Sequence, residues 1–409
     1  MTNESMIHVV GGAYEEQCAR PQWHEVFGSA GRAASAIAAV AGPNLVELHC
    51  YVDNQTQEVV AARCTLEGSR LSSTLVERTC SFRYHHGLDT PRIEAPRTSY
   101  APIHVRASKI VRFGMLEGEA IVHGERVVYD PQNALAPDIF QTNGSTAREL
   151  AVVLNHREAA AITQLGNAAP EEQAKAVLAQ NSAQVVVMKR GPLGALVCDG
   201  GTFTTIPAYV SDNVWKLGSG DIFAGHFAYR WLHEGRSAVD SAILASQATA
   251  LYCETSGFPM ASSFESFDKP AITTSPRYRA GHRPTVYLAG PFFTLAQLWL
   301  IEQARANLQS FGLNVFSPYH DVGYGSADDV VELDLDGIHH SDIVFAVGDG
   351  LDSGTIYEIG YARARDIPVI MYCENESSED QKMMQGSGCI LCTDYVSAIY
   401  KTLWTAIAR

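Results

Sequence analysis

The chain has 409 residues, and one compact core seldom exceeds about 250–300 residues, so two or three domains are expected. Hydrophobic residues make up 46% of the chain and charged residues 18%, which indicates a folded chain and excludes extensive disorder. Acidic residues outnumber basic ones by 45 to 30, and this net charge of −15 argues against nucleic-acid binding, which relies on a cationic surface.

No apolar run approaches the roughly 20 residues that a membrane-spanning helix needs, so we expect no membrane association. The first residues (MTNESMIHVVGG) lack a basic segment followed by an apolar one, and so do not resemble a secretion signal. The nine cysteines are an odd number scattered along the chain, which fits a reducing compartment. We therefore expect a cytoplasmic protein.

In the first part of the chain, short apolar runs alternate with amphipathic stretches, a pattern typical of βα units around a parallel sheet. Strands are expected at 7–10, 46–52, 127–129, 152–154, 185–189 and 195–198. Helices are expected at 28–41, 221–233 and 239–252. The first of these helices is rich in Gly and Ala, which predicts tight packing against its neighbours.

After residue 267 the pattern breaks into DKPAITTSPRYRAGHRPT, which has the composition of a linker. The βα rhythm then returns, with strands expected at 286–289, 315–317, 343–347 and 369–372 and helices around 298–311 and 356–365. We expect one domain over residues 1–268, a linker over 269–283 and a second domain over 284–409.

The most informative stretch of the first domain is WKLGSGDIFAG, residues 215–225. Gly218 and Gly220 leave backbone N–H groups uncovered at the start of a predicted helix, where amides and helix dipole attract an anion. Asp221 would lie beside that anion and could accept a proton from a hydroxyl group that attacks phosphorus. A glycine-rich turn with an aspartate cap would give the same pattern.

This stretch resembles the signature of the ribokinase-like (phosphofructokinase-B type, pfkB) family of carbohydrate and nucleoside kinases. The resemblance implies that Asp221 activates the acceptor hydroxyl and that Gly218, Ser219 and Gly220 form the anion hole for the transferred phosphoryl group. It also implies that ATP is the phosphoryl donor and that Mg²⁺ is required.

Two further stretches resemble the same family. Residues 155–158 (NHRE) are similar to its N-x-x-E motif, which implies that Asn155 and Glu158 organise Mg²⁺ indirectly and help to bind ATP. Residues 189–195 resemble the turn that borders the nucleotide, which implies that Lys189, Gly191 and Gly194 lie near ATP.

The substrate end departs from the family pattern. Gly28 and Gly31 are expected to contact the substrate, but the asparagine of the family's G-G-x-x-x-N motif is absent. Residues 129–131 (YDP) resemble the D-P-N end of a strand, with Gln132 and Asn133 following. Glutamates follow the first strand where the family usually has an aspartate, so substrate identity stays open.

The second domain is rich in carboxylates. Asp352 and Glu358 stand six residues apart across a Gly-Thr turn, and Asp334 lies in the stretch ELDLDGI. Both Asp352 and Glu358 can face one pocket at the carboxyl ends of the strands, where open α/β sheets bind ligands. Paired carboxylates suit N-glycosidic cleavage, because one stabilises or attacks the sugar cation and the other protonates the leaving base. Alternatively, Asp352 caps the helix and Glu358 is solvated.

This constellation resembles the nucleoside 2-deoxyribosyltransferase family over nearly the whole of residues 285–405. The resemblance implies that Glu358, within GTIYEIGYA, is the nucleophile and that Tyr287 orients it. Asp334 would handle the proton of the nucleobase, and Asp352 would position the 5′-hydroxyl group of the sugar.

The same resemblance implies that Gly290, Pro291, Phe292 and Gly354 contact the substrate. Related glycosidases that act on 5′-monophosphates usually have a serine in place of Asp352. Its presence favours an unphosphorylated nucleoside, although the neighbouring serine leaves the other option open. Members of this family commonly share active sites between subunits, so a homo-oligomer is expected.

The expected fold class is α/β: an N-terminal ribokinase-like three-layer α/β/α domain and a smaller Rossmann-like (flavodoxin-like) domain with a parallel sheet. The expected function is a bifunctional nucleoside-salvage or degradation enzyme acting on small molecules. The second domain would cleave or exchange the glycosidic bond, and the first would phosphorylate ribose, deoxyribose or a nucleoside. The base, the sugar, the choice between hydrolysis and transfer and the reaction order stay open. Alternatively, the first domain is a non-catalytic sensing or assembly module.

Overall fold

The computed structural model describes residues 5–132 and 136–409. The chain divides into two compact units: Met1–Ser211 with Trp215–Ala271, and Asp212–Val214 with Ile272–Arg409. All nine cysteines are buried and carry free thiols. Within the described ranges, no helix combines the length and the apolar character that crossing a membrane would require.

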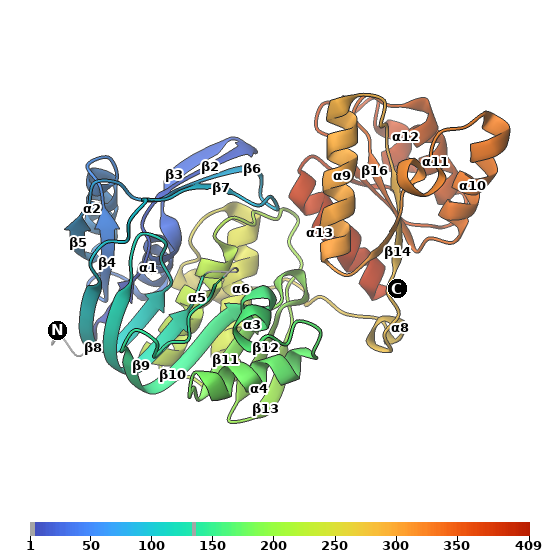
Figure 1. Cartoon of the computed structure of the whole chain (residues 1–409). Helices are drawn as coiled ribbons and strands as arrows, with labels where there is room; N and C mark the ends of the chain where they lie inside the picture. Colours follow the sequence, from blue (N-terminus) through green and yellow to red (C-terminus); the bar gives the residue numbers. More distant parts are fainter. Residues whose placement is uncertain (1–4, 133–135) are drawn as a thin grey trace. The chain divides into compact units, whose positions relative to one another are not determined.

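The N-terminal unit is built on a nine-stranded sheet (Figure 1), in the order β13-β12-β11-β10-β9-β8-β1-β4-β5. Its strands are β1 Ile7–Val10, β4 Val46–Val52, β5 Arg70–Leu75, β8 Ile103–Phe113, β9 Ala120–Asp130, β10 Thr146–Asn155, β11 Val185–Lys189, β12 Ala195–Asp199 and β13 Thr202–Ile206. The seven neighbouring strands β5, β4, β1, β8, β9, β10 and β11 pair in parallel. Strand β12 pairs antiparallel with β11, and β13 pairs antiparallel with β12. Because seven strands are parallel, their carboxyl ends meet at one edge of the sheet.

Helices cover both faces of this sheet. One core joins the sheet to α1 Gly28–Ala41, α2 Thr56–Glu67, α5 Ser219–Ala228 and α6 Ala238–Thr255. A second core on the opposite face joins it to α3 His156–Thr163 and α4 Pro170–Gln180. Helix α5 continues into a π-helical turn over Tyr229–His233, and the short helix α7 spans Ala261–Glu265.

A separate four-stranded sheet, in the order β3-β2-β6-β7, belongs to the same unit. Its strands are β2 Glu15–Arg20, β3 Trp23–Val26, β6 Ser81–His86 and β7 Arg92–Glu94. The sequence analysis predicted none of them, because their side chains are mostly polar and the period-two apolar signal is missing.

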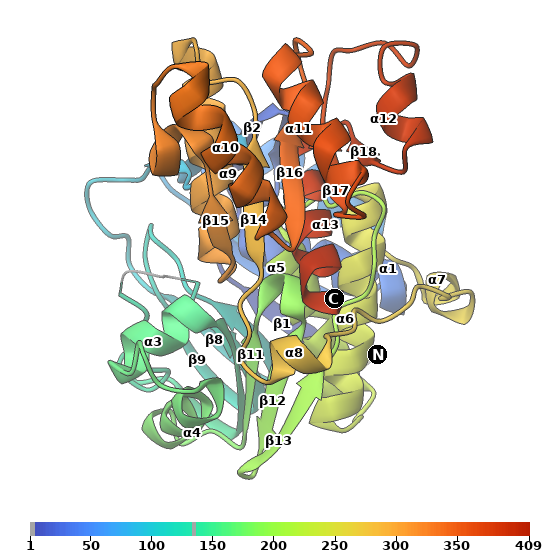
Figure 2. The same cartoon turned by 90° about the vertical axis from the view of Figure 1, so that its right-hand side faces the viewer.

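The C-terminal unit has a five-stranded parallel sheet, whose strands lie side by side in Figure 2, in the order β15-β14-β16-β17-β18. Its strands are β14 Thr285–Ala289, β15 Asn314–Phe316, β16 Ile343–Val347, β17 Val369–Tyr372 and β18 Ile390–Cys392. Helices α10 Ala327–His339, α11 Ser353–Arg363 and α12 Lys382–Gly386 share one core with the sheet. The remaining helices are α8 Pro276–Arg279, α9 Leu295–Ser310 and α13 Tyr395–Ala408.

The predicted fold class is confirmed for both units. The strand order of the C-terminal sheet, counted from its first strand, is 2-1-3-4-5, the flavodoxin-like order. In such sheets the order in which successive strands are added reverses between the first and third strands, here β14 and β16, and a crevice opens at their carboxyl ends.

Candidate functional site

The carboxylates of the C-terminal unit are placed around the switch point between β14 and β16. Tyr287 lies on β14, and Asp352 and Glu358 belong to the loop and helix that follow β16. Asp334 comes from helix α10, which packs against α11. Four predicted residues that are up to 71 positions apart in sequence are therefore carried by elements that meet at this place.

Glu358 is held by one neutral donor. The hydroxyl group of Tyr287, whose side chain is fully buried, donates a hydrogen bond of 2.7 Å to Oε1 of Glu358. Burial raises the pKa of Glu358 to about 7, and the nearby charges of Asp334 and Asp352 act in the same direction, while the tyrosine hydrogen bond opposes them. Burial, and then the charge of Glu358, raises the pKa of Tyr287, so the phenol stays protonated and is the donor in its bond to ionised Glu358.

Asp334 and Asp352 differ in how their oxygens are used. Oδ1 of Asp334 is buried and makes no hydrogen bond within the described part of the chain, and burial raises the pKa of this carboxyl group. Asp352 is the N-cap of α11: its Oδ2 accepts from the backbone N–H and the hydroxyl group of Thr355, at 2.9 and 3.0 Å. The capping alternative is therefore correct for Asp352, and the solvated alternative is wrong for Glu358.

The loop after β14 carries the other predicted contacts. Gly290 and Pro291 lead into Phe292, whose ring packs against Tyr319 and Tyr324 with centroids 5.3 and 5.8 Å apart. Sequence reasoning missed both tyrosines, although an aromatic-rich stretch such as PYHDVGY is a detectable signal. Gly354, in the first turn of α11, has no room for a side chain without crowding Oδ2 of Asp352.

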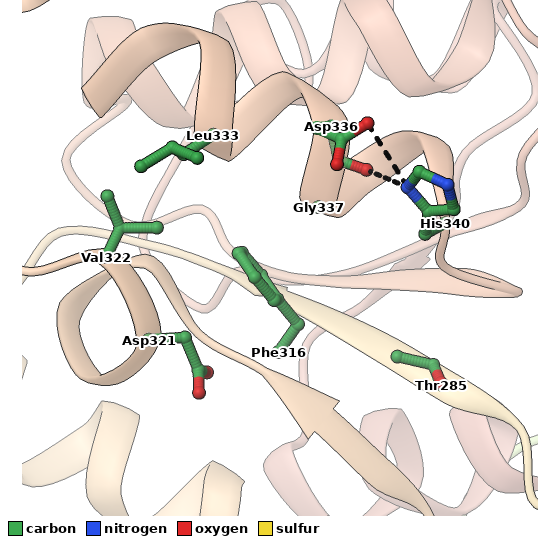
Figure 3. Close-up of a pocket in the computed structure, with 8 residues that line it drawn as sticks. All are labelled: Thr285, Phe316, Asp321, Val322, Leu333, Asp336, Gly337 and His340. Atoms are coloured by element: carbon green, nitrogen blue, oxygen red, sulfur yellow. Dashed lines mark hydrogen bonds and ion pairs between the residues drawn. The ribbon is translucent and has the colours of Figure 1, made fainter. Parts of the chain in front are cut away.

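A separate hollow of about 330 Å³ lies elsewhere in the C-terminal unit (Figure 3). Its lining includes Phe316, whose ring stacks on Tyr287, and the ion pair between Asp336 and His340, 3.2 Å apart. The four predicted catalytic residues are not among those that line it.

In the N-terminal unit, the predicted anion hole lies at the start of α5. Gly218 adopts a φ of +75°, a conformation that favours glycine, and Asp221 falls in the first turn of the helix. Lys216, which the sequence analysis did not select, donates a 3.0 Å hydrogen bond from Nζ to the hydroxyl group of Ser219. Amides, helix dipole and ammonium group together make this terminus suited to an anion.

Asp221 has both carboxylate oxygens engaged. Oδ2 accepts from Nη1 of Arg32 at 2.8 Å, and Oδ1 accepts from Nε2 of Gln132 at 2.7 Å. The other end of the Arg32 guanidinium donates from Nη2 to Glu16 Oε2 at 2.5 Å. Arg32 is only 1% exposed, so this cation is fully enclosed between two carboxylates. It lies on α1, in the region where the family asparagine is missing.

A second charged cluster lies beside Asp221, at the carboxyl ends of β9, β10 and β11. Lys189 hydrogen-bonds Asp130, and the carboxylates of Asp130 and Glu158 outweigh burial and raise the pKa of this lysine. Burial, and then the charge of Asp130, raises the pKa of Glu158 to about 7. The structure thus brings Lys189 and Glu158 of the prediction together with Asp221, and adds Asp130.

The side chain of Asn155 caps helix α3. Its side-chain oxygen accepts from the backbone N–H groups of Arg157 and Glu158 at 2.9 and 3.0 Å, and Glu158 Oε2 accepts from the N–H of Asn155. This capping box starts α3 and occupies the amide oxygen, so carboxylates are left as the ligands that could serve Mg²⁺.

The predicted glycines serve close approaches and turns. Gly28, with a φ of +63°, lies so near the carbonyl of Gly12 that a β-carbon would clash, and its N–H donates to Glu16. Gly31 has open space around it. Gly191 and Gly194 shape the tight turn between β11 and β12. Asn133 lies outside the described residues.

Comparisons with known proteins give two separate matches. Residues 286–387 match the family described as nucleoside 2-deoxyribosyltransferase, and residues 125–260 match the pfkB family of carbohydrate kinases. Among curated proteins, none matches the chain significantly.

Solved structures resemble the N-terminal unit. A fructokinase double mutant from Vibrio cholerae, bound to fructose, ADP and potassium, has 17% identity and a TM-score of 0.50, over 64% of this chain and 98% of its own. A ribokinase from Thermotoga maritima has 17% identity over the same shares, with a TM-score of 0.46. A ribokinase from Giardia lamblia has 13% identity over 64% and 99%, with a TM-score of 0.47.

The predicted resemblance to both families is confirmed. At 17% identity the fructokinase likeness establishes the fold of the N-terminal unit. The chain therefore combines a ribokinase-type domain, matching pfkB carbohydrate kinases, with a domain matching nucleoside 2-deoxyribosyltransferases, a pairing that supports a two-part kinase and transferase.

Proposed function

We propose that the C-terminal unit cleaves the N-glycosidic bond of a nucleoside, with Glu358 as the nucleophile. The observation that carries this proposal is the Tyr287–Glu358 hydrogen bond at the switch point of the parallel sheet, next to the unpaired oxygen of Asp334. A carboxylate held by a neutral donor keeps its charge available for an electron-poor carbon, and no cation within residues 5–132 and 136–409 shifts the pKa of Glu358.

The reaction would run in two steps. Ionised Glu358 attacks the anomeric carbon while the bond to the base breaks; the electron pair goes to the base nitrogen, which takes a proton from Asp334. The resulting glycosyl ester is then attacked by water or by a second base, Glu358 leaves, and Asp334 recovers a proton. The raised pKa of Asp334 suits the acid role in the first step.

The charges favour an unphosphorylated sugar. Asp352 retains one oxygen outside its capping bonds, which can accept a hydrogen bond from a sugar hydroxyl group. A 5′-phosphate would instead meet the carboxylates of Asp352, Glu358 and Asp334, and would be repelled. We therefore propose a nucleoside or deoxynucleoside as the substrate.

For the N-terminal unit we propose transfer of a phosphoryl group from ATP to a ribose-type hydroxyl group. Asp221 would accept the hydroxyl proton once the substrate displaces the amide of Gln132 from Oδ1. The start of α5, with Lys216, would bind the phosphoryl oxygens. The carboxylates of Glu158 and Asp130 fit Mg²⁺, which would neutralise phosphate charge when bound.

A second candidate is favoured by the enclosed Arg32. Because Arg32 and Gln132 already donate to both oxygens of Asp221, an acceptor hydroxyl group would have to share or displace one of these partners. In this alternative the N-terminal unit binds a nucleotide or nucleoside without turnover and regulates the C-terminal unit.

Incubating the full chain with nucleosides, with and without ATP and Mg²⁺, tests both proposals when the products are resolved by mass. Release of free base without ATP, followed by a sugar phosphate when ATP is added, supports cleavage before phosphorylation. Free base only with ATP supports the opposite order. Base release that Glu358→Gln leaves unchanged would exclude the assigned nucleophile, and undetectable ATP consumption would favour the non-catalytic alternative.

A further inference from the structure

Two histidines and a glutamate form a separate cluster in the N-terminal unit. His8 lies on β1, and Glu47 and His49 lie on the neighbouring strand β4. His8 is directly opposite Glu47 in the parallel pair, and His49 is two positions further along, so all three side chains leave the same face of the sheet. The opposite face carries the apolar residues of the first core, such as Val9 and Leu48.

The three side chains converge through atoms that can bind a metal. Nδ1 of His8 is 3.0 Å from Nε2 of His49. The two oxygens of Glu47 divide between them: Oε2 is 3.8 Å from His8 Nδ1, and Oε1 is 3.8 Å from His49 Nε2. One ligand atom from each of the three residues lies within 4.8 Å of the ligand atoms of the other two.

These distances are close to what one ion requires. Zinc binds imidazole nitrogen and carboxylate oxygen at about 2.0–2.2 Å, so two ligands of one tetrahedral ion are about 3.3–3.6 Å apart. The observed separations of 3.0 and 3.8 Å lie on either side of that range, and shifts of a few tenths of an ångström would satisfy it.

The histidines are also in the form that a metal needs. Both are buried, 6% and 9% exposed, and burial lowers the pKa of His8 and brings that of His49 to about 4, so both rings are neutral at pH 7. Nε2 of His8 makes no hydrogen bond within the described residues, so the only partner of this ring's nitrogens that bears on its tautomer there is Nε2 of His49, which lies opposite Nδ1. A neutral imidazole can then present Nδ1 to an ion after a change of tautomer alone.

We propose that His8, Glu47 and His49 form a binding site for a divalent transition metal ion of the zinc class. Two imidazole nitrogens and a carboxylate suit an ion of this class better than they suit Mg²⁺ or Ca²⁺, which take oxygen ligands. The ion would join β1 to β4 and leave one position of a tetrahedral shell for water. The exposed Arg70, which lies near His8, opposes a cation there, and Glu47 offsets it.

Titration of the metal-free chain with a metal ion, without any other ligand, tests this proposal. The full chain is freed of metal with a chelator, and Zn²⁺ is added in a calorimeter, with Co²⁺ absorption in the visible range as an independent readout of the ligand geometry. We expect saturable binding of about one ion per chain and a rise in the thermal unfolding midpoint with Zn²⁺. Because all nine thiols are buried, they should not compete for the ion.

Two variants and a control locate the site. His49→Ala should weaken Zn²⁺ binding by about 100-fold or more, since loss of an outer-shell partner alone can cost about 10–100-fold. Glu47→Gln, a change of similar size at a half-buried position, should weaken it about tenfold and serves if His49→Ala fails to fold. His85→Ala is the matched control, because exposed His85 pairs with Asp89 at 2.6 Å outside the cluster. Absence of saturable binding, or equal binding by Glu47→Gln and the unmodified chain, would overturn the proposal.

Discussion

The two units bury a carboxylate at the carboxyl edge of a parallel sheet, but they treat its charge in opposite ways. Asp221 faces a fully enclosed guanidinium, and both of its oxygens are engaged. Glu358 faces a neutral phenol, and burial together with two further carboxylates raises its pKa to about 7. Asp221 has a counter-ion, which it shares with Glu16, whereas no cation of the described residues acts on Glu358.

This difference indicates how each site must work. A carboxylate without a counter-ion is destabilised when ionised, and it gains most from a positively charged transition state such as an oxocarbenium ion. Asp221 gains less, because Arg32 already neutralises its charge and the substrate must first displace Gln132 from Oδ1. The C-terminal site is therefore ready for its proposed reaction, and the N-terminal site requires a rearrangement.

The largest effect is expected at Asp221. If the N-terminal unit is a kinase, Asp221→Asn should lower phosphoryl transfer by about 10²–10⁴-fold, because the amide cannot accept the hydroxyl proton. The measurement is ADP formation with ribose, deoxyribose and nucleosides as acceptors. Base release by the same variant should stay unchanged, and ADP formation that survives the substitution would remove the kinase role of this residue.

The next effect concerns stability. Arg32→Met should destabilise the N-terminal unit by about 3–5 kcal/mol, because it leaves the buried carboxylates of Glu16 and Asp221 without their cation. Chemical unfolding followed by circular dichroism measures this change. Arg148→Met is the control: Arg148 is exposed and its 3.3 Å pair with Glu125 is worth about 0–1 kcal/mol. Equal losses in both variants would contradict the charge-matched account of Asp221.

A smaller effect concerns the pH dependence of base release. With a Glu358 pKa of about 7, the rising limb of kcat/KM should have its midpoint near that value, because only the ionised form attacks. At higher pH the rate should fall again as Asp334 loses the proton that it donates to the base. Tyr287→Phe removes a hydrogen bond that favours the ionised form, so the midpoint should move up by about one unit. A midpoint that falls or stays in place would show that the phenol does not act on Glu358.

The smallest effect is expected from Asp352→Asn. Asparagine caps helices as well as aspartate does, so α11 should be preserved. Loss of the negative charge should lower the pH midpoint of base release by a few tenths of a unit, because the charge of Asp352 is the last of the causes that raise the pKa of Glu358. The pH profile of kcat/KM measures this shift, and an upward shift would contradict the electrostatic account.

The apolar elements could be predicted from sequence, because burial leaves a periodic signal. Strands β1, β4, β11, β16 and β17 and helix α1 have the predicted bounds. The strands of the small sheet could not be predicted in this way. Strand β2 (EEQCAR) buries Glu16 and Cys18, and a buried glutamate has no hydrophobic signature.

Of the two candidate sites, the carboxylates of the C-terminal unit were more accessible to sequence reasoning, because their motifs resemble a known family. The partners of Asp221 could not be identified from the sequence. Arg32 lies in a helix of small residues, and its role depends on Glu16, 16 positions away, and on Asp221, 189 positions away. Only the folded chain shows that these charges meet.

The central claim is that Glu358 forms a covalent bond to the sugar. The most direct test mixes the full chain with a nucleoside, stops the reaction with acid and determines the mass of the peptide that contains residue 358. The account predicts a mass increase equal to the glycosyl group on that peptide, absent in Glu358→Gln. A glycosyl group found on another peptide, or rapid base release by Glu358→Gln, would contradict it.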